Sequence, residues 1–212
     1  KYPEYAQRLV NLAMMMRNPK NNTQFVGLNV VYDDDDMLRT QEQGQRLLER
    51  MAQYSADTDI HMQTQVRVAA NIANGIRHAY KEFRATEILI GMHMHPEVSQ
   101  KFWGEFHQSL FNGLSRQIIM ARIRQPLNTI RRIQVAVPSR AEFEPGFYRW
   151  VERLSRMARN LDCRIQFHGR MEALSLINEF IKNRYPEVRS DYTLMNHWNE
   201  MPQIASQISP DH

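Results

Sequence analysis

Histidine side chains gather in one short stretch and could bind a metal ion or sense pH. His93 and His95 alternate beside Glu97, and His107 follows in the next segment. Alternate residues of an extended segment point the same way, so two imidazoles could face one zinc-like ion. The spacing brings no further ligand to them, so we expect solvated histidines and no metal site. The same imidazoles could instead sense pH, because they titrate near neutrality.

Other residue groups that could do chemistry have simpler explanations. Asp33 to Asp36 lack the glycine and the spaced glutamate of an EF-hand, so we expect a solvated loop that leaves a strand. Cys163 lies among strand-like residues, where an inert buried thiol is more common than a nucleophile. The sequence contains no nucleophile–base pair, no paired-carboxylate signature and no Walker loop. It therefore does not support an enzyme.

One stretch must position most of these residues. Glu87–Gly91 is an apolar run that ends in a glycine, a polar loop follows, and a helix begins near Gly104. This order predicts a buried parallel strand, a loop at its carboxyl end and a helix that returns over the sheet. Ligands of open α/β sheets usually bind at the carboxyl ends of the strands. We therefore expect any site to lie at residues 91–105.

Strands alternate with helices along the whole chain, which predicts an α/β protein with parallel sheets. In the first part we predict helices at 3–17, 38–56, 72–83 and from 104 onward, and strands at 25–32, 61–69, 87–92 and 118–121. In the second part we predict strands at 130–137, 163–167 and 192–195, and helices at 147–161, 174–181 and 202–207.

A linker at Gln125–Asn128 divides the chain into two expected domains, 1–124 and 125–212. They look like imperfect tandem copies of one unit: the first lacks a strand before its first helix, and the second stops early. Because the chain opens on Lys1, we expect a piece of a longer protein. A missing central strand would leave backbone groups of its neighbours unpaired. We expect the 130–137 strand, or a strand from a second molecule, to close this gap.

Composition and charge exclude several classes of protein. The 212 residues are 42% hydrophobic and 24% charged, as in ordinary globular proteins. No apolar run approaches the ~20 residues that span a bilayer. The net charge of +4 hides eight acidic residues in 29–63 and twelve arginines in 116–170. We expect these arginines on helix exteriors, and no nucleic-acid binding, because exposed aromatic residues do not interleave with them.

The unit resembles a universal stress protein domain. That family's phosphate motif is glycine, two residues, glycine, nine residues, glycine, then serine or threonine. Here the same spacing runs through Gly91, Met94, Gly104 and Glu105, after the approach Ala85–Ile90. The resemblance implies a Rossmann-like fold in two tandem units, the second truncated. It also implies ligand-binding candidates at Val31, Gly91, Met94, Gly104 and Glu105.

Two of these residues depart from the family's pattern. Met94 puts a thioether where a glycine would let backbone amides approach phosphate oxygens. Glu105 puts a carboxylate in the first helical turn, which suits the helix dipole but repels phosphate. We therefore expect a degenerate motif that holds no cofactor, although ATP remains possible.

More narrowly, the chain is similar to the cytoplasmic C-terminal region of some bacterial cation/proton (sodium/hydrogen) antiporters, at Pro3–Leu9 and in the 85–121 block. This similarity implies a regulatory or interaction domain on the cytoplasmic side of the inner membrane. Its partners would be the membrane portion of the same parent chain and a second copy in a homodimer, without direct membrane insertion of this fragment. The alternatives are a free-standing universal stress protein that binds ATP or another adenine nucleotide, and a dimerisation module without a ligand.

Overall fold

The computed structural model describes residues 3–20, 24–58, 60–92, 104, 106 and 116–212. The chain divides into two compact units. Unit 1 comprises residues 1–11 and 19–124, and unit 2 comprises residues 12–18 and 125–212. Parallel strands alternate with helices in both units, so the predicted α/β class is confirmed. The interpretation of the two units as copies of one another stays a prediction.

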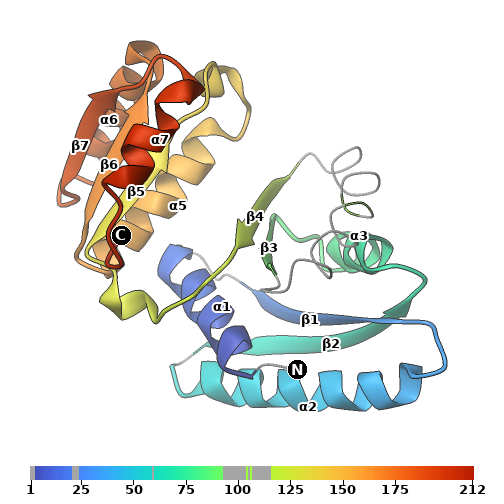
Figure 1. Ribbon diagram of the computed structural model, residues 1–212. Coiled ribbons are helices and arrows are strands. Elements are labelled where there is room, and N and C mark those ends of the chain that lie inside the picture. The colour runs from blue at the N-terminus through green and yellow to red at the C-terminus, as the bar shows by residue number, and fades with distance from the viewer. Residues whose placement is uncertain (1–2, 21–23, 59, 93–103, 105, 107–115) are drawn as a thin grey trace. The chain divides into compact units, whose positions relative to one another are not determined.

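Unit 1 contains two separate two-stranded parallel sheets (Figure 1). Its elements in chain order are α1 (Pro3–Met16, shared with unit 2), β1 (Phe25–Tyr32), α2 (Met37–Ala56), β2 (Met62–Ala69), α3 (Ile72–Glu82), β3 (Glu87–Gly91) and β4 (Gln117–Ala121). β1 pairs with β2 from Phe25 opposite Met62 to Tyr32 opposite Ala69. β3 pairs with β4 from Glu87 opposite Gln117 to Gly91 opposite Ala121.

Two helix glycines let α2 and α3 approach opposite faces of β1. A Cβ atom on Gly44 of α2 would lie 2.6 Å from the Asn29 side chain, and one on Gly75 of α3 would lie 2.5 Å from the Val30 side chain. Successive residues of a strand point to opposite faces, so the two helices cover both sides of the β1–β2 pair. The side chain of Asn71 accepts a hydrogen bond from the Asn74 amide (2.8 Å) and thereby caps α3.

Unit 2 is built on a three-stranded parallel sheet in the order β5-β6-β7. Its elements are β5 (Arg132–Ala136), α5 (Phe147–Asn160), β6 (Arg164–Gly169), α6 (Met171–Arg184), β7 (Ser190–Leu194) and α7 (Met201–Ser206), with short 3-10 turns at Leu127–Thr129, Ala141–Phe143 and Trp198–Glu200. Phe147, Val151 and Ala158 form the buried stripe of α5. They pack with Ile165 and Phe167 of β6 in the core of this unit.

The other face of the unit 2 sheet is polar. Arg164 of β6 forms an ion pair with Asp191 of β7 at 2.9 Å, and Gln166 donates a hydrogen bond to Thr193 at 2.9 Å. These residues alternate along the strands with Ile165 and Phe167, which belong to the core. All-parallel sheets usually bury both faces under apolar side chains, so this sheet departs from the common pattern.

Of the two strands expected to close the gap in the first sheet, one is ruled out, and a strand from a second molecule stays a prediction. The predicted 130–137 strand forms β5 and pairs with β6, from Arg132 opposite Arg164 to Ala136 opposite His168. It therefore does not close the gap in the first sheet. Backbone hydrogen bonds within unit 2 extend this pairing beyond β5, since the Val137 amide donates to the His168 carbonyl at 2.7 Å. Among the helices of the described ranges, none has the length and apolar character needed to cross a bilayer.

Candidate functional site

The carboxyl ends of β3 and β4 form the edge where the sequence predicts a ligand site, and α1 supplies side chains to it. The hydroxyl of Tyr5 lies within hydrogen-bond distance of the carbonyl oxygens of Met92 (2.9 Å) and Ala121 (2.8 Å). Arg8 donates from Nη1 to the Arg124 carbonyl oxygen at 2.9 Å. Among the described residues, α1 therefore contacts the carbonyl groups of Met92, Ala121 and Arg124, whereas a phosphate would need free N–H donors.

Gly91 lacks a side chain because α1 occupies the space beside it. A Cβ atom on Gly91 would lie 2.5 Å from Cδ1 of Leu9 and 2.7 Å from Cε1 of Tyr5. Real Cβ atoms do not approach other atoms so closely, so a larger residue would force the Leu9 and Tyr5 side chains to move. The resemblance assigns Gly91 to a phosphate motif, but the packing of the Leu9 and Tyr5 side chains also favours a glycine here.

The remaining motif residues do not assemble into a site within the described residues. Val31 is 6% exposed and lies in β1, so its side chain belongs to the core and only its backbone could reach a ligand. Gly104 is helical, and a Cβ atom there would meet no other atom within 4 Å. The other candidates lie outside the described residues: Met94, Glu105, His93, His95, Glu97 and His107.

The four aspartates after β1 form the predicted exposed loop. Asp34 accepts a hydrogen bond from the Asp36 amide at 3.1 Å, and Asp36 pairs with Arg39 at 3.0 Å in the first turn of α2. These contacts turn the chain from β1 into α2. In the part of the chain that the structure describes, no three His, Cys, Asp or Glu side chains converge as a metal site would require.

Cys163 is buried, as the sequence predicts. Burial raises the pKa of its thiol, which opposes formation of the nucleophilic thiolate. This environment is that of a structural cysteine.

A buried polar cluster links α5 to the end of α6, and sequence reasoning missed it. Arg156 is only 4% exposed, although we expected the arginines of this region on helix exteriors. Its Nε donates to the Tyr185 hydroxyl at 3.1 Å, and its Nη2 pairs with the Glu152 carboxylate. Burial raises the pKa of Tyr185, and the Arg156 guanidinium opposes this shift. The i,i+4 spacing of Glu152 and Arg156 was the available signal.

A second buried polar contact lies at the carboxyl end of β6. His168 is 2% exposed, and its Nε2 lies 2.7 Å from Oε1 of Gln134 on β5. Its Nδ1 is buried and makes no hydrogen bond to the described residues. Burial lowers the pKa of the imidazole, so the neutral ring is favoured. This contact joins β5 to β6.

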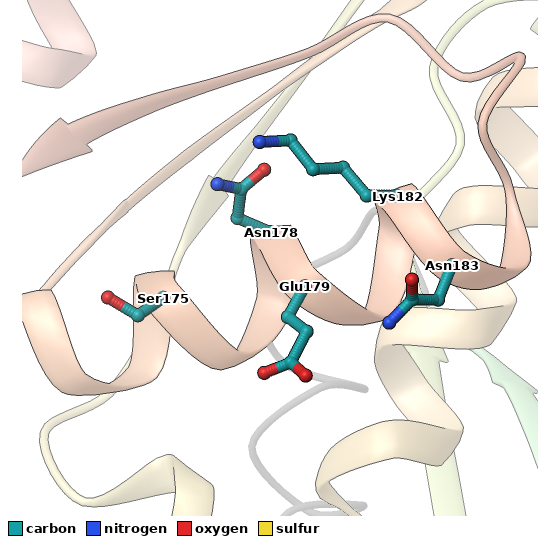
Figure 2. Close-up of a pocket in the computed structure, with 5 residues that line it drawn as sticks. All are labelled: Ser175, Asn178, Glu179, Lys182 and Asn183. Carbon is teal, nitrogen blue, oxygen red and sulfur yellow. The ribbon is translucent and has the colours of Figure 1, made fainter.

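The outer face of α6 carries a shallow hollow with a volume of about 320 Å³. Figure 2 shows its five lining side chains, all from α6: Ser175, Asn178, Glu179, Lys182 and Asn183. We call this the α6 hollow. Amides, one hydroxyl and one charge of each sign line it, so it suits a polar surface and not an apolar small molecule.

Comparison with known proteins identifies the fold. No family model matches the sequence, and no curated protein matches it. Among solved structures, a universal stress protein from Archaeoglobus fulgidus DSM 4304 is similar, with a TM-score of 0.64 and 11% identity over 96% of this chain and 76% of that chain. The chain therefore has a universal stress protein-like α/β fold.

Proposed function

We propose that this chain is a non-catalytic interaction domain that regulates a cation/proton antiporter from the cytoplasmic side of the inner membrane. The observation that carries the proposal is a pair of open strand edges in unit 1. Leu28 and Val30 of β1 and Ile88 and Ile90 of β3 pack around one apolar cluster. Yet among the described residues β1 pairs only with β2, and β3 only with β4.

The open edges present backbone groups to a further strand. The bond from the Asp33 amide to the Ala69 carbonyl sets which β1 amides face β2. Alternate residues direct their amides to opposite sides, so those of Val26, Leu28 and Val30 point away from β2. By the same argument, the bond from the Met92 amide to the Ala121 carbonyl directs the amides of Leu89 and Gly91 away from β4.

The burial of these strands supports the same conclusion. β6 has neighbours on both sides, and four of its six residues are buried. β1 has one neighbour and only Val31 buried, and no residue of β3 is buried, although both strands are largely apolar. Isolated two-stranded sheets are marginally stable. A strand added by another polypeptide segment would cover the apolar side chains and pair the open edges.

Such an edge allows regulation through a simple thermodynamic link. If a strand binds unit 1 more tightly in one conformation of a transporter than in another, binding favours the first conformation. The size of the effect is the difference between the two binding free energies. The sequence similarity at Pro3–Leu9 and in the 85–121 block suggests the membrane portion of the same parent chain as that partner.

The coding sequence upstream of Lys1 tests the transporter assignment. About ten or more apolar spans of ~20 residues each would support it. Deleting residues 1–212 from that protein should then change antiport rates in membrane vesicles. A start codon directly before Lys1, or a deletion without effect on transport, would contradict the proposal.

The likeness to the Archaeoglobus fulgidus protein favours a second candidate, a free-standing universal stress protein that binds ATP or another adenine nucleotide. Titration calorimetry with ATP, AMP and a cyclic dinucleotide separates the two candidates. We expect no binding at millimolar nucleotide, because Tyr5 and Leu9 fill the space at Gly91. A micromolar Kd for ATP would establish the second candidate.

A further inference from the structure

A buried histidine lies on the polar face of the unit 2 sheet. Arg164, Gln166 and His168 alternate along β6 with Ile165 and Phe167, which pack with α5 and α6 in the core. The side chains of the first three residues therefore share the face opposite these helices. Arg164 and Gln166 are partly exposed, whereas His168 is only 2% exposed. A further segment must therefore cover this face at His168.

The segment that follows β7 crosses this face. It starts at the carboxyl end of β6, where Nη2 of Arg170 donates to the Asn196 carbonyl oxygen at 3.4 Å. It reaches the amino end of β5, where the Arg132 amide donates to the Asp211 carbonyl oxygen at 3.3 Å. Because α5 and α6 occupy the other face, this segment crosses the polar one, and Figure 1 shows α7, in red, across β5 and β6. We call residues 196–212 the strap.

The strap packs loosely on the sheet. None of the six residues of α7 is fully buried, and its apolar residues Met201 and Ile204 are only half-buried. A helix of six residues does not persist in water without tertiary packing. Release of α7 from the sheet therefore also melts the helix.

His168 can take up one more proton but has no acceptor for it. Its Nε2 lies 2.7 Å from Oε1 of Gln134, and because Oε1 is an acceptor, Nε2 carries the proton of the neutral ring. A second proton goes to Nδ1, which is buried and makes no hydrogen bond to the described residues. A buried, charged N–H donor without a partner is unfavourable, so the protonated ring needs water.

The charged groups near His168 offer no replacement for that water. Those on the polar face, at its carboxyl end and on the strap are Arg132, Arg164, Arg170, Asp191, His197, Glu200, Asp211 and His212. Asp191 is paired with Arg164 at 2.9 Å. Glu200 accepts hydrogen bonds from two backbone amides of the strap, and Asp211 accepts one from a serine hydroxyl of the strap. Each carboxylate is thus engaged with a group other than His168.

We propose that the strap is a cover that opens in acid, because protonation of His168 at Nδ1 releases α7 from the polar face of the sheet. The closed strap accommodates the neutral ring, and the open strap lets water reach the charged ring. Burial lowers the pKa of the covered ring below the usual value of about 6.5, and the open form regains that value. Between these two pKa values, the ratio of open to closed chains rises up to about tenfold for each pH unit that is lost.

Hydrogen exchange of the whole chain, read by mass spectrometry, tests this proposal. Protection factors, which remove the intrinsic pH dependence of exchange, should be lower in α7 than in α6 and should fall in α7 by up to about tenfold from pH 6.5 to 5.5. Equal protection of α7 and α6 at both pH values would overturn the proposal, because the strap would then open only when unit 2 unfolds. A protection factor of α7 that does not change with pH would also overturn it.

Two matched variants identify the group that titrates. His168→Gln keeps a polar side chain beside Gln134 and removes the titration, so the protection of α7 should no longer depend on pH. His212→Gln removes the terminal imidazole of the strap and should leave the pH dependence intact. A fall that persists in His168→Gln, or that disappears in His212→Gln, would overturn the proposal.

Nuclear magnetic resonance of the unsubstituted chain gives a test that needs no variant. The ring signals of His168 and the amide signals of α7 should change with the same midpoint, below pH 6.5, because one proton controls both. Different midpoints for the ring and the helix would overturn the proposal.

Discussion

The hydroxyl oxygen of Tyr5 lies 2.8 Å from the carbonyl oxygen of Ala121, although 116 positions separate the two residues. This contact joins the first helix of the chain to the carboxyl end of β4. The same tyrosine contacts the carbonyl of Met92 after β3 and lies over Gly91. α1 therefore occupies the edge of the sheet at which the sequence predicts a ligand site.

Tyr5→Phe removes the hydroxyl and leaves both carbonyl groups without this donor. We expect the free energy of unfolding to fall by about 1 kcal/mol, the usual net value of a hydrogen bond in a protein. Urea unfolding followed by circular dichroism measures it. Tyr148→Phe is the control, because Tyr148 is 45% exposed. An equal effect of both substitutions would show that the Tyr5 hydroxyl contributes nothing specific.

Gly75→Ala tests the close approach of α3 to β1. The new Cβ atom would lie 2.5 Å from Cγ1 of Val30, a stiff β-branched side chain, so we expect a loss of about 1–3 kcal/mol. Gly104→Ala should instead be neutral or stabilising by up to about 1 kcal/mol, because the residue is helical and its Cβ atom meets nothing within 4 Å. Thermal unfolding of both variants checks this contrast. Destabilisation by Gly104→Ala would indicate a packing role that the described contacts lack.

His168 should make unit 2 less stable in mild acid. Burial lowers its pKa below the unfolded value of about 6.5, so the unfolded chain binds more protons between these two pKa values. The free energy of unfolding should therefore rise with pH through this range and level off above pH ~6.5. His168→Gln should flatten this slope relative to that of the unsubstituted chain. Urea unfolding between pH 5 and 8 measures both slopes, and equal slopes would refute the assignment.

Arg156→Ala should destabilise unit 2 by about 1–3 kcal/mol, because it removes the buried guanidinium that contacts the Glu152 carboxylate and the Tyr185 hydroxyl. Those two groups keep their own hydrogen bond of 3.2 Å, which limits the loss. The double variant Glu152→Leu, Arg156→Met should recover much of this loss, since apolar residues can replace a buried ion pair. Arg39→Ala, which breaks an exposed pair, should cost less than about 0.5 kcal/mol. Denaturant unfolding of the three variants tests this ranking. A cost for Arg156→Ala as small as that for Arg39→Ala would contradict it.

The sequence predicts local elements well and long-range contacts poorly. The apolar run at Glu87–Gly91 identifies β3, and the periodic stripe of Phe147, Val151 and Ala158 identifies α5, because both signals lie within a few residues. The expectation that the 130–137 strand closes the gap in the first sheet is wrong, since several strands of similar pattern could fill one gap and this one pairs with β6. The burial of Arg156 depends on Tyr185 of a later segment, which no local pattern reveals.

The candidate site shows the same limit. A glycine after an apolar strand fits a phosphate loop and a helix contact equally well, and only the positions of Tyr5 and Leu9 favour the second. The open edges of β1 and β3 were partly predictable. The repeat pattern calls for a strand before the first helix, and the first unit begins with α1 instead. Which polypeptide supplies that strand is a property of the assembly.

Residue-resolved hydrogen exchange in β1 and β3 tests the central claim most directly. We expect the outward amides of Leu28, Val30 and Leu89 to exchange much faster than the inward amides of Asn29 and Val31 in this chain alone. In the longer parent protein the outward amides should become as protected as the inward ones. Equal protection of the outward and inward amides in the isolated chain would contradict the claim that unit 1 has strand edges open to a further strand.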